Sequence, residues 1–125
     1  MRASKLEQAI LDWIAGRQLS LAGRISAGEV KRRVHTGAGF YVYLVGEVEA
    51  GWDRPPVDGP VIRSPQLDAG GGSTLWLSRG SPSCLEIYSF GNHFPEHLDE
   101  FELSSSDGSA QFAAAADERR NGARG

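Results

Sequence analysis

The residues with the clearest potential for chemistry lie in the string HFPEH at positions 93–97. This spacing satisfies the H-x-x-E-H pattern of inverted zinc metallopeptidases, in which two histidines one helical turn apart bind zinc and the glutamate activates the zinc-bound water. Pro95 lies between the two histidines, however, and the residue before a proline is disfavoured in helical conformation. His93 and His97 are therefore not expected to share a helical face, and we predict no zinc peptidase.

A transition metal could instead be bound by side chains from several elements, namely His35, His93, His97 and either Glu96 or Asp99. Neutral imidazoles suit zinc, copper or iron, and the ligands of such a site need not share one helix. Three histidines are nevertheless few for a site of this kind. We predict no metal ligand and no cofactor.

Cys84 is the only cysteine in the chain. A catalytic thiol needs a neighbouring base or cation, and no pattern in the sequence brings a histidine to this residue. Because Cys84 begins an apolar segment, it is better interpreted as a small core residue. The sequence therefore predicts no catalytic residue.

Two glycine-rich strings, at residues 36–39 and 70–73, could in principle bind phosphate. Phosphate-binding loops direct their backbone amides, and the start of a following helix, at the anion. Both strings here precede segments with the composition of strands. We interpret them as hairpin turns and assign no nucleotide.

The charge distribution favours protein over nucleic acid as a partner. The formal net charge is −3, whereas nucleic-acid binders usually have a basic excess. One stretch without lysine or arginine contains five acidic residues: Glu86, Glu96, Asp99, Glu100 and Glu102. This stretch is either a solvated face or an acidic surface that binds a basic partner.

Trp52 is the best candidate for an exposed aromatic anchor, because its neighbours are glycine, aspartate, arginine and proline. Tryptophan is enriched among the residues that dominate protein interfaces. We therefore predict that a protein partner contacts Trp52, Glu96, Asp99, Glu100 and Glu102. The alternative is a small-molecule or metal-binding protein, or a modest hydrolase, that uses the region of His93, Glu96 and His97.

The expected compartment is the cytoplasm. A single cysteine cannot form an internal disulfide, and small secreted domains usually contain several. Polar residues interrupt the N-terminal segment where a signal peptide would be apolar, and no apolar run approaches the roughly 20 residues that span a bilayer. We predict no contact with a membrane.

The elements that must position these residues begin with a helix over residues 3–16. Its apolar residues recur at three- and four-residue spacings, which places them on one stripe. Ser4 is the expected N-cap, and Gly16 the expected terminator. Residues 17–28 fit either a short helix or a connection, and we treat them as a loop.

The rest of the ordered chain has the composition of strands. Residues 29–49 predict a β-hairpin, because they are rich in β-branched and aromatic residues on both sides of a turn. Residues 51–60, with three prolines, predict a surface loop. Three further strands are expected at residues 61–62, 75–77 and 84–90, with turns at 68–73 and 79–82. Residues 95–103 predict a short helix with Pro95 in its first turn.

Four strings, HTGAGFYVYL, GPVIRSP, GGGSTLWLSRG and LEIYSFGNHFPE, occur in this order. Together they resemble a recurring group of small uncharacterised bacterial proteins with TGxGFY-like and LExYSxGxxFPE-like segments. The resemblance covers residues 30–103 and implies one intact domain, but it implies no activity. By analogy alone, some small acidic α+β proteins are immunity proteins of bacterial toxin systems.

We therefore expect one α+β domain over residues 1–103, in which an N-terminal helix packs on a mostly antiparallel sheet of four to five strands and a short C-terminal helix follows. Residues 104–125 are poor in large apolar groups, and we expect a flexible or weakly helical tail. The predicted function is that of a non-enzymatic protein-binding module.

Overall fold

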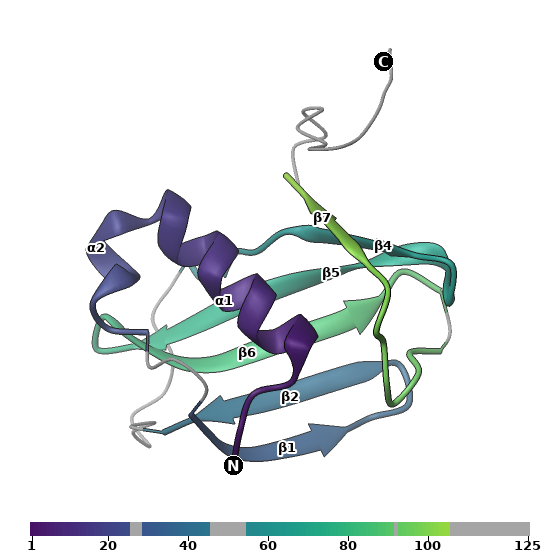
Figure 1. Ribbon diagram of the computed structural model, residues 1–125. Coiled ribbons are helices and arrows are strands. Elements are labelled where there is room, and N and C mark those ends of the chain that lie inside the picture. The colour runs from purple at the N-terminus through teal and green to yellow at the C-terminus, as the bar shows by residue number, and fades with distance from the viewer. Residues whose placement is uncertain (26–28, 46–54, 92, 106–125) are drawn as a thin grey trace.

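The computed structural model describes residues 1–25, 29–45, 55–91 and 93–105. Its centre is one antiparallel sheet of seven strands in the order β1-β2-β6-β5-β4-β7, with β3 paired to β5 beside this path (Figure 1). The strands are β1 (Val30–His35), β2 (Gly39–Leu44), β3 (Val57–Asp58), β4 (Val61–Ser64), β5 (Leu67–Ser78), β6 (Ser81–Ser89) and β7 (Glu102–Ser104). Two helices, α1 (Lys5–Arg17) and α2 (Leu19–Ala22), complete the described fold. The mixed helix-and-sheet class is confirmed, but the expected four to five strands were too few.

Helix α1 begins where the sequence predicts. The Ser4 side chain accepts a hydrogen bond from the backbone N–H of Glu7, and the Glu7 side chain accepts one from the backbone N–H of Ser4, which forms a capping box. The helix continues through Gly16 to Arg17, so Gly16 is not the terminator that we expected. Because α2 follows almost at once, the loop predicted over residues 17–28 was wrong for its first part.

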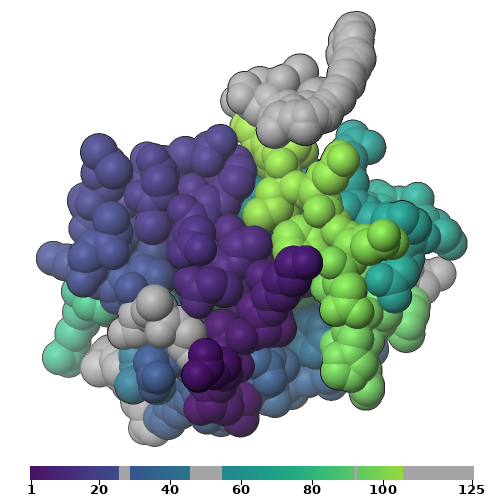
Figure 2. All heavy atoms as spheres, in the orientation of Figure 1, coloured from purple at the N-terminus to yellow at the C-terminus, as the bar shows by residue number. Residues whose placement is uncertain are grey.

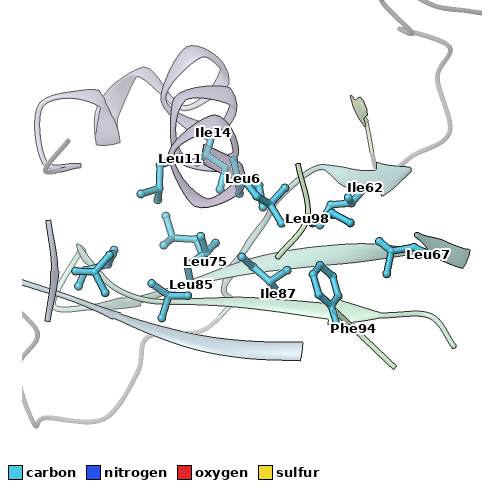
Figure 3. Close-up of a cluster of buried hydrophobic side chains, with 14 of the residues drawn as sticks. Leu6, Leu11, Ile14, Ile62, Leu67, Leu75, Leu85, Ile87, Phe94 and Leu98 are labelled. Carbon is cyan, nitrogen blue, oxygen red and sulfur yellow. The ribbon is translucent and has the colours of Figure 1, made fainter. Parts of the chain in front are cut away.

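Helix α1 lies across one face of the sheet (Figure 1). Leu6, Leu11 and Ile14 of the helix face buried side chains of β5 and β6 (Figure 3). These side chains include Leu75, Leu85 and Ile87, and all six are at most 5% exposed. Full burial of an aliphatic side chain contributes about 1.5–3 kcal/mol to stability, so this layer holds helix and sheet together.

A half-buried ion pair adds to the contact between α1 and the sheet. The Arg33 guanidinium on β1 donates to both carboxylate oxygens of Glu7, with its Nε 2.6 Å from Oε2 and its Nη2 2.7 Å from Oε1. The Glu7 side chain is only 4% exposed. The hydrogen bond to Glu7 raises the pKa of Arg33 above its ordinary value. This pair of hydrogen bonds ties the start of the helix to β1, an edge strand of the sheet.

The β1–β2 hairpin predicted over residues 29–49 is confirmed for its described part, which ends at residue 45. Its turn contains Gly37 with a positive φ of 92°, a conformation that glycine adopts without steric cost. The second glycine-rich string is different, because Gly70, Gly71 and Gly72 lie inside β5. The turn predicted at residues 68–73 was therefore wrong, and the β4–β5 turn lies at residues 65–66 instead.

The glycines of the sheet allow close approach between strands. A Cβ on Gly39 would collide with the carbonyl oxygen of Ile87, and a Cβ on Gly72 would lie 2.9 Å from three atoms of the Tyr88 ring. Tyr88 is paired with Gly39 on one side and Gly72 on the other. Its ring therefore occupies the space that a side chain at position 72 would fill. Glycine inside a strand often marks such an approach.

The short helix predicted over residues 95–103 is absent from the described structure. Phe94 and Leu98 are buried, at 0% and 7% exposure, and the Phe94 backbone N–H donates to the Gly37 carbonyl at 2.9 Å. Because tertiary contacts satisfy this segment, it runs irregularly over the sheet and ends in β7, where Leu103 pairs with Ile62. The physical reason is that two buried anchors and a strand partner outweigh a weak helical preference.

Strand β7 extends to Ser104, one residue past the expected end of the domain. The tail predicted from residue 104 lies outside the described residues from position 106 onward. No helix among the described residues is long and apolar enough to cross a membrane.

The Gly39→Ala substitution is predicted to destabilise the fold by about 3 kcal/mol, because the new methyl group has no room against the β6 backbone. Gly16→Ala is the matched control, since nothing lies within 4 Å of the position where its Cβ would be. The control is expected to be neutral or to gain up to about 1 kcal/mol, as alanine favours a helix more than glycine does. Urea unfolding of both variants measures the difference, and equal stabilities would contradict the packing described for β2 and β6.

The Glu7→Gln substitution is predicted to lower the free energy of unfolding by about 2 kcal/mol. The amide keeps an acceptor for the cap but leaves the Arg33 charge without its partner, and the cost is moderated because Arg33 is 28% exposed. Asp12→Asn, on the exposed side of the same helix, is expected to change stability by less than about 0.5 kcal/mol. Thermal and urea unfolding test both variants; a loss no larger than that of the control would show that the pair is dispensable.

Candidate functional site

Four of the five predicted contact residues lie together on the surface. Glu96, Asp99, Glu100 and Glu102 are all exposed, and we call them the acidic ridge. Figure 2 shows the segment that carries them as a yellow-green strip beside the beginning of α1. The fifth residue, Trp52, lies outside the described residues.

The two buried side chains of this segment position the ridge. Phe94 and Leu98 point into the layer between α1 and the sheet (Figure 3). Phe94 also makes an edge-to-face contact with Phe40, with ring centroids 5.6 Å apart. Because these anchors fix the backbone on both sides of Glu96, the carboxylates project outward from a supported segment.

A narrow cleft lies between the ridge and the start of α1. Its volume is about 170 Å³. Glu7 and Arg33 line it together with Phe40, and Glu96 and Asp99 of the ridge line its other side. The charges of the paired Glu7 and Arg33 largely cancel. Glu96 and Asp99 then give the cleft negative charge, which Lys5 in its lining offsets in part.

A wider groove lies on the other side of the ridge, beside β4. Its volume is about 620 Å³, and it is lined by residues 63–65 and 99–102. Phe101 and Pro65 give this groove an apolar part, and Asp99, Glu100 and Glu102 give it negative charge. Arg63 is the basic residue of the groove, and it pairs with Glu102 in the β4–β7 register. The ridge thus separates two hollows.

The ridge carboxylates have few ionic partners in the part of the chain that the structure describes. Glu96 lies 4.0 Å from Nδ1 of His35, and no ion pair of the other three is found there. Residues 96–102, which carry the ridge, include no lysine or arginine. The fold nevertheless brings Lys5 near them, with its Nζ 6.0 Å from the centroid of the Phe101 ring. Proximity of this kind between distant segments could not be read from the sequence.

The three histidines do not converge. His35 stacks on Phe40 with ring centroids 4.5 Å apart, and its Nε2 lies 3.1 Å from the Phe94 carbonyl oxygen. His93 and His97 are exposed, and in the described segments no group of three or more histidine, cysteine, aspartate or glutamate residues could bind a metal ion. Glu96 is therefore brought to His35, which the H-x-x-E-H spacing does not indicate.

Cys84 is fully buried in β6. It pairs with Tyr43 of β2 and Trp76 of β5, so aromatic neighbours flank it on both sides. This burial agrees with its interpretation as a small core residue.

The sheet face opposite α1 carries an aromatic surface that the sequence reasoning missed. Antiparallel register places Tyr41, Glu86 and Thr74 in one row of this face, with Tyr43, Cys84 and Trp76 in the next row. Val34 and Phe90, at 41% and 53% exposure, lie at its margins. Residues 85–90 give a sequence signal for this surface, because Leu85, Ile87 and Ser89 alternate with Glu86, Tyr88 and Phe90. Either set of side chains could be the buried one. Only the position of α1 decides between the two faces.

Glu86 is the acidic residue in the middle of this aromatic surface. The Trp76 indole Nε1–H donates to Glu86 Oε1 at 3.1 Å. The negative charge of Glu86 raises the pKa of Tyr41 above its ordinary value, and burial of the Tyr41 hydroxyl is the second cause. Tyr41, Trp76 and Glu86 therefore interact as one group.

The Glu86→Gln substitution is predicted to lower the pKa of Tyr41 toward its ordinary value of about 10, because a neutral amide no longer opposes formation of the phenolate. Glu102→Gln, on the acidic ridge, is expected to leave the pKa of Tyr41 unchanged. NMR titration of the tyrosine ring carbons measures the shift in both variants. An unchanged Tyr41 titration in Glu86→Gln would contradict the contact between these residues.

Comparisons with models of protein families, with curated proteins and with solved structures find no match to this chain. No relative therefore assigns a role to the acidic ridge, to its two hollows or to the aromatic surface. The resemblance of residues 30–103 to small bacterial proteins stays a prediction.

Proposed function

We propose that this protein is a non-enzymatic binding module whose acidic ridge contacts a basic surface of a partner protein. The observation that carries the proposal is the exposure of Glu96, Asp99, Glu100 and Glu102 on a segment anchored by buried side chains. Complementary charge steers association and disfavours wrong partners. A nucleic-acid partner is disfavoured, because phosphates would meet carboxylates here.

The anchoring of the segment supports binding. Interfaces lose affinity when a loop must be ordered on association, and a segment fixed beforehand avoids that cost. Phe94 and Leu98 hold the ridge from beneath, while β7 pairs with β4 at its end. The ridge can therefore present its charges in one arrangement.

The lining of the groove beside β4 supports a protein as the partner. It is open and about 620 Å³ in volume, with both apolar and charged lining, as in a protein interface. The cleft next to Glu96 and His97, at about 170 Å³, is smaller than the usual ligand pocket of roughly 300–1,000 Å³. This difference favours the binding module over a hydrolase that uses His93, Glu96 and His97.

Within this proposal, Trp52 is a further contact, and the cytoplasm is the proposed location. An immunity-type protein is one example of such a module, since it would neutralise a toxin by covering a basic surface. That role rests on analogy.

The test is a fourfold variant of the ridge: Glu96→Gln, Asp99→Asn, Glu100→Gln and Glu102→Gln. Wild-type protein is expected to retain one stoichiometric partner from the source cells, and the purified complex is expected to weaken as salt rises because screening reduces surface attraction. The variant is predicted to bind this partner at least about tenfold more weakly, equivalent to roughly 1.4 kcal/mol. Calorimetry with the purified partner measures the change.

The matched control alters four exposed acids elsewhere by the same chemistry: Asp12→Asn, Glu29→Gln, Asp58→Asn and Asp68→Asn. This control changes the net charge by the same amount. It therefore distinguishes an effect of the ridge carboxylates on binding from an effect of the overall charge. Equal weakening by both fourfold variants, or the absence of any partner, would oppose the proposal.

A further inference from the structure

The aromatic surface on the sheet face opposite α1 has a distinct centre. Tyr41 is the direct cross-strand partner of Glu86, which puts their Cβ atoms about 5 Å apart. Trp76 donates its indole N–H to Glu86 Oε1 at 3.1 Å. Tyr88 follows on the same face of β6, with its ring over Gly72. We call Glu86, Tyr41, Trp76 and Tyr88 the Glu86 cup.

The cup faces away from the described helices. Helix α1 and the ridge segment lie on the opposite side of the sheet (Figures 1 and 3). The side chains of the cup are half-buried, and Phe90 beside Tyr88 is 53% exposed. The Tyr88 and Phe90 rings are 6.0 Å apart and inclined by 59°. Tyr88 and Phe90 thus extend the aromatic surface along β6 beyond Glu86.

The carboxylate of this cup lacks a cation in the described part of the chain. One of its oxygens accepts the Trp76 hydrogen bond, and no ion pair of Glu86 is found among the described residues. Arg32 lies on the same face, and its guanidinium carbon is 3.7 Å from the centroid of the Tyr43 ring. Arg32 lies on β1, two strands away from β6, and among the described residues no ion pair joins it to Glu86.

A carboxylate bordered by aromatic rings selects a cation. The rings attract positive charge through their faces, and the carboxylate forms charge-assisted hydrogen bonds. We propose that the Glu86 cup binds an arginine side chain presented by a partner protein. This site goes beyond the acidic ridge, because it lies on the other face of the sheet and uses none of the ridge residues.

Arginine fits the cup better than lysine does. Its planar guanidinium can lie on a tyrosine ring while its N–H groups reach Glu86 Oε2, the oxygen that Trp76 does not contact. The compact ammonium of lysine cannot stack in this way. The same protein already uses both contacts elsewhere. Arg17 lies 3.7 Å from the centroid of the Trp13 ring, and Arg33 binds both oxygens of Glu7.

The experiment is an NMR titration of the ¹⁵N-labelled full chain with N-acetyl-L-argininamide. The Trp76 indole N–H and the amides of β6 around Glu86 are expected to shift saturably, with a dissociation constant of roughly millimolar order for so small a probe. Glu86→Gln is predicted to weaken this binding by about tenfold, since it removes a charged hydrogen-bond acceptor. N-acetyl-L-glutaminamide, which is neutral, is expected to give no saturable shift.

Two further variants make the result specific. Tyr41→Leu removes a ring but keeps an apolar side chain, and it is predicted to weaken binding about threefold through the lost cation–π contact. Glu102→Gln on the ridge is expected to leave the cup titration unchanged. Absence of a saturable shift at Trp76, equal shifts with the neutral amide, or unaltered binding by folded Glu86→Gln would each overturn the proposal. None of these outcomes bears on the ridge, whose fourfold variant keeps Glu86.

Discussion

The structure depends on the burial of one face of the sheet by α1 and by the segment that contains Phe94 and Leu98. Apolar side chains from β5 and β6 meet those of the helix in a single layer, and the removal of this surface from water is the main stabilising contribution. The ion pair between Glu7 and Arg33 fixes where the helix begins on that layer. The acidic ridge and the aromatic surface take their positions from this packing.

Two consequences follow for function. The anchors of the ridge segment are part of the layer itself, so its carboxylates are displayed by the same burial that stabilises the fold. The opposite face of the sheet must then carry every alternate side chain of β2, β5 and β6, including Tyr41, Trp76 and Glu86. One core therefore creates two chemically different surfaces, one acidic and the other aromatic with a single carboxylate between its rings.

Local signals in the sequence were sufficient for some elements and not for others. Ser4 and the apolar stripe identified α1, and alternation identified the first hairpin, because both patterns arise within a few residues. The glycines of β5 were interpreted as a turn. Gly72 in fact makes room for the Tyr88 ring of the neighbouring strand, and a local sequence pattern does not indicate such a contact. Residues 95–103 were interpreted as a helix from their local spacing. The contacts that prevent a helix involve residues distant in sequence, because Phe94 and Leu98 are buried against other elements. The exposure of the ridge was predictable from its charge, but its two hollows and its proximity to His35 required the tertiary structure.

The central claim is that the acidic ridge is the contact surface for a protein partner. Hydrogen–deuterium exchange of the full chain, with and without its purified partner, tests this most directly. Slower exchange in the complex is predicted over residues 96–104, including the short β7 strand, with no change at the exposed surface of α2. Unchanged exchange over residues 96–104, together with protection confined to other parts of the chain, would contradict it.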